Sequence, residues 1–117
     1  MSSSTAFSLS QQNNTVIFKF QPCSSFDPLD HQKEITEQLA AEPYLSCQNI
    51  LVDCSAVTYA NSLFLEWLLH LASVARERNG KFGLAAVGGF LKDLMHVTKL
   101  DERWTIYEDT DQGLAAM

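Results

Sequence analysis

Alternating apolar and polar positions predict a hairpin at the start of the chain. In the segment "TVIFKFQ", the apolar residues Val16, Phe18 and Phe20 occupy every second position, as in a half-buried strand. A weaker alternation covers residues 5–9, and the polar cluster at residues 11–14 separates the two segments as a turn would. This pattern predicts two antiparallel strands joined by that turn.

The next periodic segment predicts a helix. Asp27 is a favoured N-cap residue and Pro28 is tolerated at the first helical position, so the helix is expected to begin there. Ile35 and Leu39 form a narrow apolar stripe, and the helix is expected to end by Glu42, which precedes a proline.

A short aliphatic run, Asn49–Cys54, predicts a strand that is covered on both faces. A longer helix is expected to open near Ser62 and to run to Asn79, with Gly80 as its C′ residue. Projected at about 100° per residue, it is amphipathic. The polar side holds Glu66, His70, Ser73 and Glu77, the apolar side holds Phe64, Leu68, Leu71, Ala72 and Ala75, and Leu63 and Trp67 lie at the border.

The second half of the chain repeats the order of strand and helix. Residues 81–87 predict a covered strand, Gly88 begins a break, and a further helix follows. Residues 104–109 predict a last short strand before a terminal helix that is capped by Thr110 or Asp111. Strands that alternate with helices are joined by right-handed crossovers, which predicts a parallel core sheet.

These elements together predict an α/β fold in one domain over residues 1–117. Its mixed β-sheet would combine the N-terminal hairpin with parallel core strands, packed against about four helices. Residues 1–4 are expected to be disordered.

Composition narrows the classes of function. The chain has 117 residues, 46% of them hydrophobic, and a net charge of −6, which argues against binding a nucleic-acid backbone or an anionic membrane surface. The most apolar stretch, Leu63–Ala75, contains Glu66 and His70 and is shorter than the roughly 20 residues that a membrane span needs. No signal peptide is visible at the start. We therefore expect a cytoplasmic protein that does not insert into a membrane.

The sequence gives no case for an enzyme, a metal or a cofactor. An odd number of cysteines without a C-x-x-C pair, namely Cys23, Cys47 and Cys54, indicates reduced thiols. The histidines, His31, His70 and His96, have no ligand spacing. Neither a phosphate-binding loop nor a G-x-S-x-G motif is present.

The stretch "NILVDCSAVTYANSLFLEWL" resembles the centre of the STAS domain, the fold of bacterial anti-sigma factor antagonists. That family typically shows a strand ending in Asp-Leu-Ser, a short loop, and Asp-Ser-Ser/Thr-Gly-Leu opening a helix. Here "VDCS" at residues 52–55 and "NSLFL" at residues 61–65 take these places. The chain end, "LMHVTKLDERWTIYEDTDQGLAAM", also resembles the family's ending.

The resemblance implies a regulatory function. In the family, a cognate anti-sigma factor kinase phosphorylates the serine after the loop aspartate, the unphosphorylated protein binds that kinase and frees the sigma factor, and a PPM-type phosphatase resets the switch. The acceptor here would be Ser62, and Asp53 and Ser55 would belong to the structural loop after the central strand. The residues expected to bind the partner are Asn61, Ser62, Leu63, Glu66, Trp67 and His70.

Three departures from the motif keep alternatives open. Asn61 replaces an acid beside the acceptor, while Leu63 and Phe64 replace small residues that let a kinase loop approach the backbone. Ser62 could serve only as a helix cap, and Phe64 is expected to point into the core. Asp53 is more readily a strand-end acid that caps the following loop than a chemical group.

Two other functions remain. The chain could be a constitutive STAS subunit of a sensory scaffold or of a transporter ATPase, without phosphorylation. Binding of a nucleotide or a small apolar ligand at the same loop ranks last, since only the fold suggests it. The sequence allows a homodimer and does not name the partner or the sigma factor.

Overall fold

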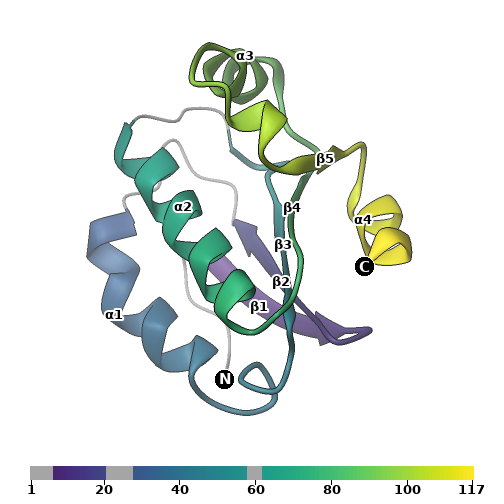
Figure 1. Cartoon of the computed structure of the whole chain (residues 1–117). Coiled ribbons are helices and arrows are strands. Elements are labelled where there is room, and N and C mark those ends of the chain that lie inside the picture. The colour runs from purple at the N-terminus through teal and green to yellow at the C-terminus, as the bar shows by residue number, and fades with distance from the viewer. Residues whose placement is uncertain (1–6, 21–27, 58–61) are drawn as a thin grey trace.

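The computed structural model describes residues 7–20, 28–57 and 62–117, with the backbone alone for residues 28–32 (Figure 1). The expected disorder of residues 1–4, the helix cap at Asp27, and the side chains of Cys23 and His31 lie outside the described residues.

A five-stranded sheet in the order β1-β2-β3-β4-β5 forms the centre of the molecule. Its strands are β1 (Phe7–Gln12), β2 (Thr15–Phe20), β3 (Asn49–Asp53), β4 (Phe82–Ala85) and β5 (Thr105–Tyr107). β1 and β2 pair in an antiparallel hairpin, and every later pair is parallel. The predicted mixed sheet is therefore confirmed.

In the described part of the chain, four α-helices and one short 3₁₀ helix pack around this sheet. They are α1 (Pro28–Leu39), α2 (Ser62–Glu77), α3 (Gly89–Val97), η1 (Leu100–Glu102) and α4 (Thr110–Ala116). α1 and α2 lie on one face of the sheet, α4 lies on the other, and α3 lies beyond one end of the strands (Figure 1). The sequence pattern correctly predicted four helices in this order.

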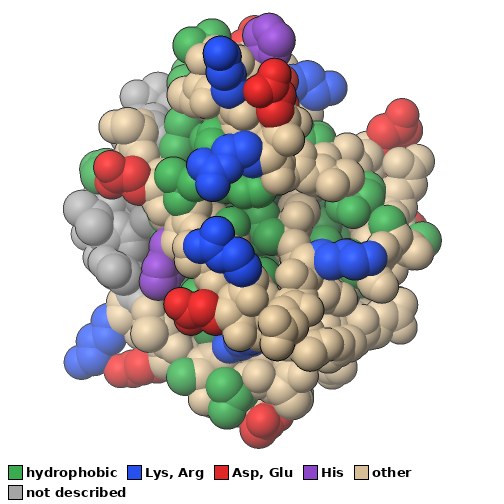
Figure 2. All heavy atoms as spheres, in the orientation of Figure 1, with side chains coloured by type: hydrophobic (Ala, Val, Ile, Leu, Met, Phe, Trp, Pro, Cys, Tyr) green, Lys and Arg blue, Asp and Glu red, His purple; other side chains and the backbone are tan. Residues whose placement is uncertain are grey.

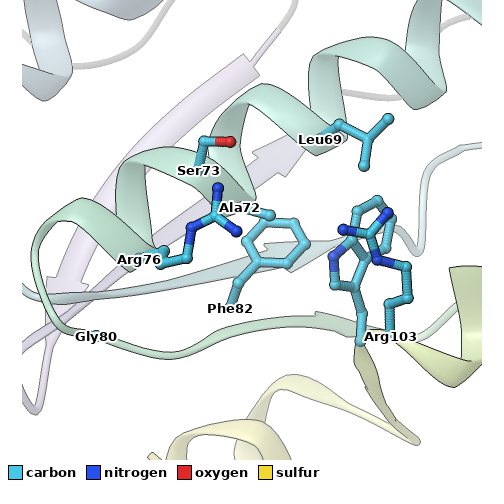
Figure 3. A pocket seen from close by; sticks show the side chains of 8 residues that line it. Leu69, Ala72, Ser73, Arg76, Gly80, Phe82 and Arg103 are labelled. Carbon is cyan, nitrogen blue, oxygen red and sulfur yellow. The ribbon is translucent and has the colours of Figure 1, made fainter.

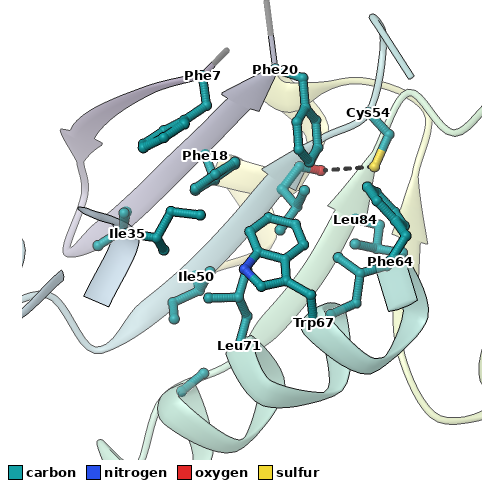
Figure 4. Packing of buried hydrophobic residues seen from close by; sticks show 14 of the residues in the cluster. Phe7, Phe18, Phe20, Ile35, Ile50, Cys54, Phe64, Trp67, Leu71 and Leu84 are labelled. Atoms are coloured by element: carbon teal, nitrogen blue, oxygen red, sulfur yellow. Dashed lines mark hydrogen bonds between the residues drawn. The ribbon is translucent and has the colours of Figure 1, made fainter. Parts of the chain in front are cut away.

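The main hydrophobic core fills the space between the sheet and helices α1 and α2 (Figure 4). Phe18 lies at its centre, stacked on Phe7 with ring centroids 5.0 Å apart and in edge contact with Trp67 at 4.8 Å. The predicted alternation in β2 explains this, because Val16, Phe18 and Phe20 all face the helices and are buried. A smaller cluster on the opposite face, made of Leu51, Ala85 and Leu114, lies under α4.

The end of α2 is held by backbone and side-chain hydrogen bonds. The N–H of Gly80 donates to the carbonyl of Ala75 at 2.8 Å, and the left-handed residue is Asn79, with φ of 59°. Gly80 is therefore C″ of a Schellman motif, and its predicted place at C′ is wrong. Glycine is required there for another reason: a Cβ on Gly80 would lie 1.8 Å from the carbonyl oxygen of Gln48.

Arg78, just after α2, holds the connection between α1 and β3. Its guanidinium donates hydrogen bonds to the carbonyls of Leu39 at 2.9 Å, Tyr44 at 2.9 Å and Cys47 at 3.0 Å. The carbonyl of Tyr44 also accepts from the N–H of Cys47 at 3.1 Å, and the guanidinium thus joins three acceptors of this connection through charge-assisted hydrogen bonds. The side chain is half-buried, and its hydrogen bonds to these carbonyls give it a structural role.

The cap of α4 differs from the prediction. The side chain of Asp109, and not that of Thr110 or Asp111, accepts the hydrogen bond from the N–H of Gln112 at 2.8 Å. Asp109 has the extended backbone of an N-cap residue, with φ of −150°. Thr110 and Asp111 already lie inside the helix.

Candidate functional site

The candidate site lies where α2 begins, near the carboxyl end of β3. Ser62 is the first residue of α2 and is exposed. The next residue, Leu63, is 41% exposed and places an apolar side chain beside the serine. Asn61, predicted to take part in the site, lies outside the described residues. The free N–H groups at a helix start favour a negative charge at this position.

An exposed flank continues along α2 from this point. Glu66 and His70 follow Ser62 at intervals of four residues, so the three side chains share one face of the helix, and all are exposed. Leu63 lies three residues before Glu66 and borders the same face. We call Ser62, Leu63, Glu66 and His70 the α2 flank.

Two residues in the first turns of α2 face inward, and one of them, Trp67, was predicted as a site residue. Phe64 is 2% exposed, as expected for a core side chain. Trp67 is 6% exposed, and its ring contacts Phe18 at 4.8 Å, Phe20 at 5.6 Å and Phe64 at 5.8 Å between centroids (Figure 4). Trp67 therefore supports the core beneath the α2 flank, and its burial leaves little of its surface for the predicted contact with a partner.

The carboxylate of Asp53 is engaged in structural hydrogen bonds at the end of β3. Its Oδ1 accepts from the N–H of Ser55 at 2.9 Å, and its Oδ2 accepts from the hydroxyl of Thr110 at 3.0 Å. The first bond shapes the loop that leads toward α2, and the second connects β3 to the start of α4. Both carboxylate oxygens therefore have a local structural role.

The two described thiols are poor nucleophiles. Burial, and then the nearby charge of Asp53, raise the pKa of Cys54, whose Sγ lies 3.8 Å from the carbonyl of Val52 (Figure 4). Burial also raises the pKa of Cys47, against a lowering effect of Arg78. Because the thiolate is the reactive form, neither sulfur is activated.

Within the described ranges, no three His, Cys, Asp or Glu side chains lie close enough together to hold a metal ion. His96 Nδ1 lies 3.0 Å from Asp101 Oδ2 at the surface, and His70 belongs to the α2 flank. No helix in the described part of the chain is long and apolar enough to span a bilayer.

Two exposed apolar residues of α3 were not predicted as site residues. Phe90 is 54% exposed and Val97 is 79% exposed. α3 starts beyond the carboxyl end of β4, as α2 starts beyond that of β3. Their exposure could have been predicted from the sequence, because both lie away from the helix face that contains the buried residues Leu91 and Met95.

Comparison with known proteins agrees with this architecture. The family model described as "Mlab, STAS domain" matches residues 28–108. An anti-sigma-factor antagonist (STAS) domain protein from Planctomyces limnophilus is similar in structure, with a TM-score of 0.79 and 18% identity, over 94% of this chain and 96% of that one.

An anti-sigma factor antagonist from Mycobacterium paratuberculosis is also similar, with a TM-score of 0.70 and 20% identity, over 94% of this chain and 91% of that one. No match is found among curated proteins. At these identities the structures establish a shared fold, while the family model covers well over half of the sequence. The chain therefore belongs to the STAS-domain family.

Proposed function

We propose that this chain is an anti-sigma factor antagonist that binds a serine-kinase anti-sigma factor through the α2 flank. Phosphorylation of Ser62 by that kinase would end the binding, and a PPM-type phosphatase would restore it, all in the cytoplasm. The observation that carries the proposal is an exposed serine at the first position of α2, followed directly by the exposed side chain of Leu63. Both solved relatives described above are anti-sigma factor antagonists.

The position of Ser62 suits a switch because a phosphate affects the fold and the surface in opposite ways. Free N–H groups and the positive dipole end at a helix start favour an exposed phosphate by about 0.3–1 kcal/mol. The same group adds a charge of about −1.5 to −2 beside Leu63, which makes docking of an apolar partner surface costly. The described first turn of α2 contains no acidic residue, although Glu66, one turn later on the same face, would offset part of this gain.

Labelling of the purified chain by the anti-sigma factor kinase of its own genome tests the proposal. We expect one phosphate per chain and no labelling of Ser62→Ala. Ser55→Ala is the matched control, because Ser55 is also exposed and lies at the same end of β3. Equal labelling of Ser62→Ala and the wild type would remove Ser62 from the mechanism.

A second candidate is a constitutive STAS subunit of a sensory scaffold or a transporter ATPase. The exposed side chain of Leu63 favours it, because a bulky apolar residue beside the acceptor serves permanent docking better than repeated access by a kinase. Leu63→Ala should weaken partner binding in both cases. Ser62→Asp separates them: the switch predicts loss of binding, and the constitutive subunit predicts wild-type binding.

A further inference from the structure

A second site lies on the other half of α2, away from Ser62. A cavity of about 280 Å³ opens between α2, the start of β4 and the segment after η1 (Figure 3). Its lining residues are Leu69, Ala72, Ser73, Arg76, Gly80, Phe82, Arg103 and Trp104. We call it the α2–β4 pocket. None of the residues of the α2 flank lines it.

The exposed lining of the pocket is mostly polar, and its smaller apolar part is partly aromatic. Phe82 and Trp104 meet edge to face, with ring centroids 5.1 Å apart and planes inclined at 69°. Leu69 and Ala72 of α2 complete the apolar wall, and both are only half-buried. This apolar part can hold a flat ring beside the polar groups of the lining, because aromatic rings pack well against rings in stacked or edge contact.

The pocket concentrates positive charge on an acidic protein. The chain has a net charge of −6 and only three arginines, and Arg78 is occupied by backbone carbonyls. The other two, Arg76 and Arg103, both line the pocket, and no Asp or Glu is found among its described lining residues.

Both guanidiniums are exposed, and neither forms a hydrogen bond or ion pair with another described residue. Figure 3 shows Arg76 beside Phe82 and Ser73, with Arg103 across the pocket. In the space-filling view, cationic side chains border an apolar area in the middle of this face (Figure 2). The hydroxyl of Ser73 adds a further polar group to the lining.

We propose that the α2–β4 pocket binds a small organic carboxylate with a flat, one- or two-ring apolar body. The ring system would lie against Phe82 and Trp104, and the carboxylate would pair with Arg76 and Arg103. Guanidinium groups match carboxylates in geometry and form charge-assisted hydrogen bonds with them. The cavity volume lies just below the roughly 300–1,000 Å³ of drug-sized pockets, which suits a small ligand.

Titration of the ¹⁵N-labelled full chain with 2-naphthoate tests this proposal. Both tryptophans belong to the main core, but they report separately because Trp104 lines the pocket and Trp67 does not. We expect a saturable shift of the Trp104 indole N–H signal with little change at Trp67. The neutral analogue 2-naphthalenemethanol should bind at least about fivefold more weakly, since it lacks the charge that the arginines recognise.

Charge variants connect binding to the proposed residues. Arg76→Gln combined with Arg103→Gln should weaken naphthoate binding about tenfold, as expected for the loss of two charge-assisted contacts. Lys92→Gln, which removes an exposed cation of α3, should bind like the wild type. Ser62→Asp should also bind naphthoate normally, so this test does not depend on the function of the α2 flank.

Several results would overturn the proposal. They are the absence of a selective shift at Trp104, equal binding of the neutral analogue, and unchanged affinity of the double arginine variant. Saturable binding of an acidic aromatic peptide without binding of naphthoate would also overturn it, and would assign the pocket to a protein partner.

Discussion

At the scale of single residues, Arg78 forms more structural hydrogen bonds than any other charged side chain described above. It donates to the carbonyls of Leu39, Tyr44 and Cys47. Arg78→Met should lower the free energy of unfolding by about 2–3 kcal/mol, because partly buried carbonyls lose a charged donor. Arg76→Met, an exposed change in the last turn of α2, should stay within about 0.5 kcal/mol. Urea denaturation measures both, and equal effects would contradict the structural role of Arg78.

Gly80 is the position where a single methyl group should matter most. A Cβ there would overlap the carbonyl oxygen of Gln48, and backbone atoms would have to move. We expect Gly80→Ala to cost about 3 kcal/mol. Gly89→Ala at the start of α3 meets no atom within 4 Å and should stabilise the helix by about 0.5–1 kcal/mol. Opposite signs of the two changes in thermal unfolding are the expected result. A neutral Gly80→Ala would contradict the close approach.

The side chains of the candidate site could be predicted only in part at this scale. The helical projection placed Phe64 in the core, and the structure buries it. Trp67 lay at the border of the projection, where helical periodicity does not decide between surface and core. Its burial depends on Phe18 and Phe20, which reach it from a distant strand.

At the scale of elements, α4 has only seven residues and depends on its cap and its contacts with the sheet. Asp109→Ala should lower the free energy of unfolding by about 1 kcal/mol, because the N–H of Gln112 loses its acceptor. Asp109→Ser keeps an acceptor and should restore most of that loss. Thermal unfolding distinguishes them. An unimpaired Asp109→Ala would show that the cap contributes nothing.

The order and type of the elements were predictable because periodicity and capping residues are local signals. The residues at which these elements begin and end were harder to predict. Asp109, Thr110 and Asp111 are three adjacent residues that can each cap a helix, and the backbone conformation at Asp109 decides among them. Asn79 and Gly80 can each adopt the left-handed conformation, and the close approach of Gln48 determines which of them must be glycine.

At the scale of the whole molecule, the buried thiols connect stability to pH. The pKa of Cys54 is raised by burial and by Asp53, so the folded chain keeps this thiol protonated above the ordinary pKa of about 8.5. The unfolded chain releases that proton, and stability should therefore fall as pH rises above that value, by up to about 1.4 kcal/mol per pH unit. Below it, the contribution of this thiol is constant.

Cys54→Ala isolates this effect from other groups that titrate at alkaline pH. Its free energy of unfolding, measured by urea denaturation between about pH 8 and 10, should fall less steeply than that of the wild type. Identical slopes for the two proteins would contradict the buried, protonated state of Cys54.

The two proposed sites differ in how far the sequence alone could predict them. Ser62 was found from a motif that is continuous in sequence, so the family resemblance could suggest it. The α2–β4 pocket brings Arg76 and Arg103 together from α2 and from the segment after η1. No local pattern relates these residues, and only the packing of β4 between them forms the site.

The central claim is that a phosphate on Ser62 removes a partner from the α2 flank. The most direct measurement is the affinity of the anti-sigma factor kinase for the unmodified chain and for the chain carrying phosphoserine at position 62, by isothermal titration calorimetry. Phosphorylation should weaken binding by at least about tenfold, since the added charge must be desolvated beside Leu63. Equal affinity of the two forms would contradict the switch and favour a constitutive subunit.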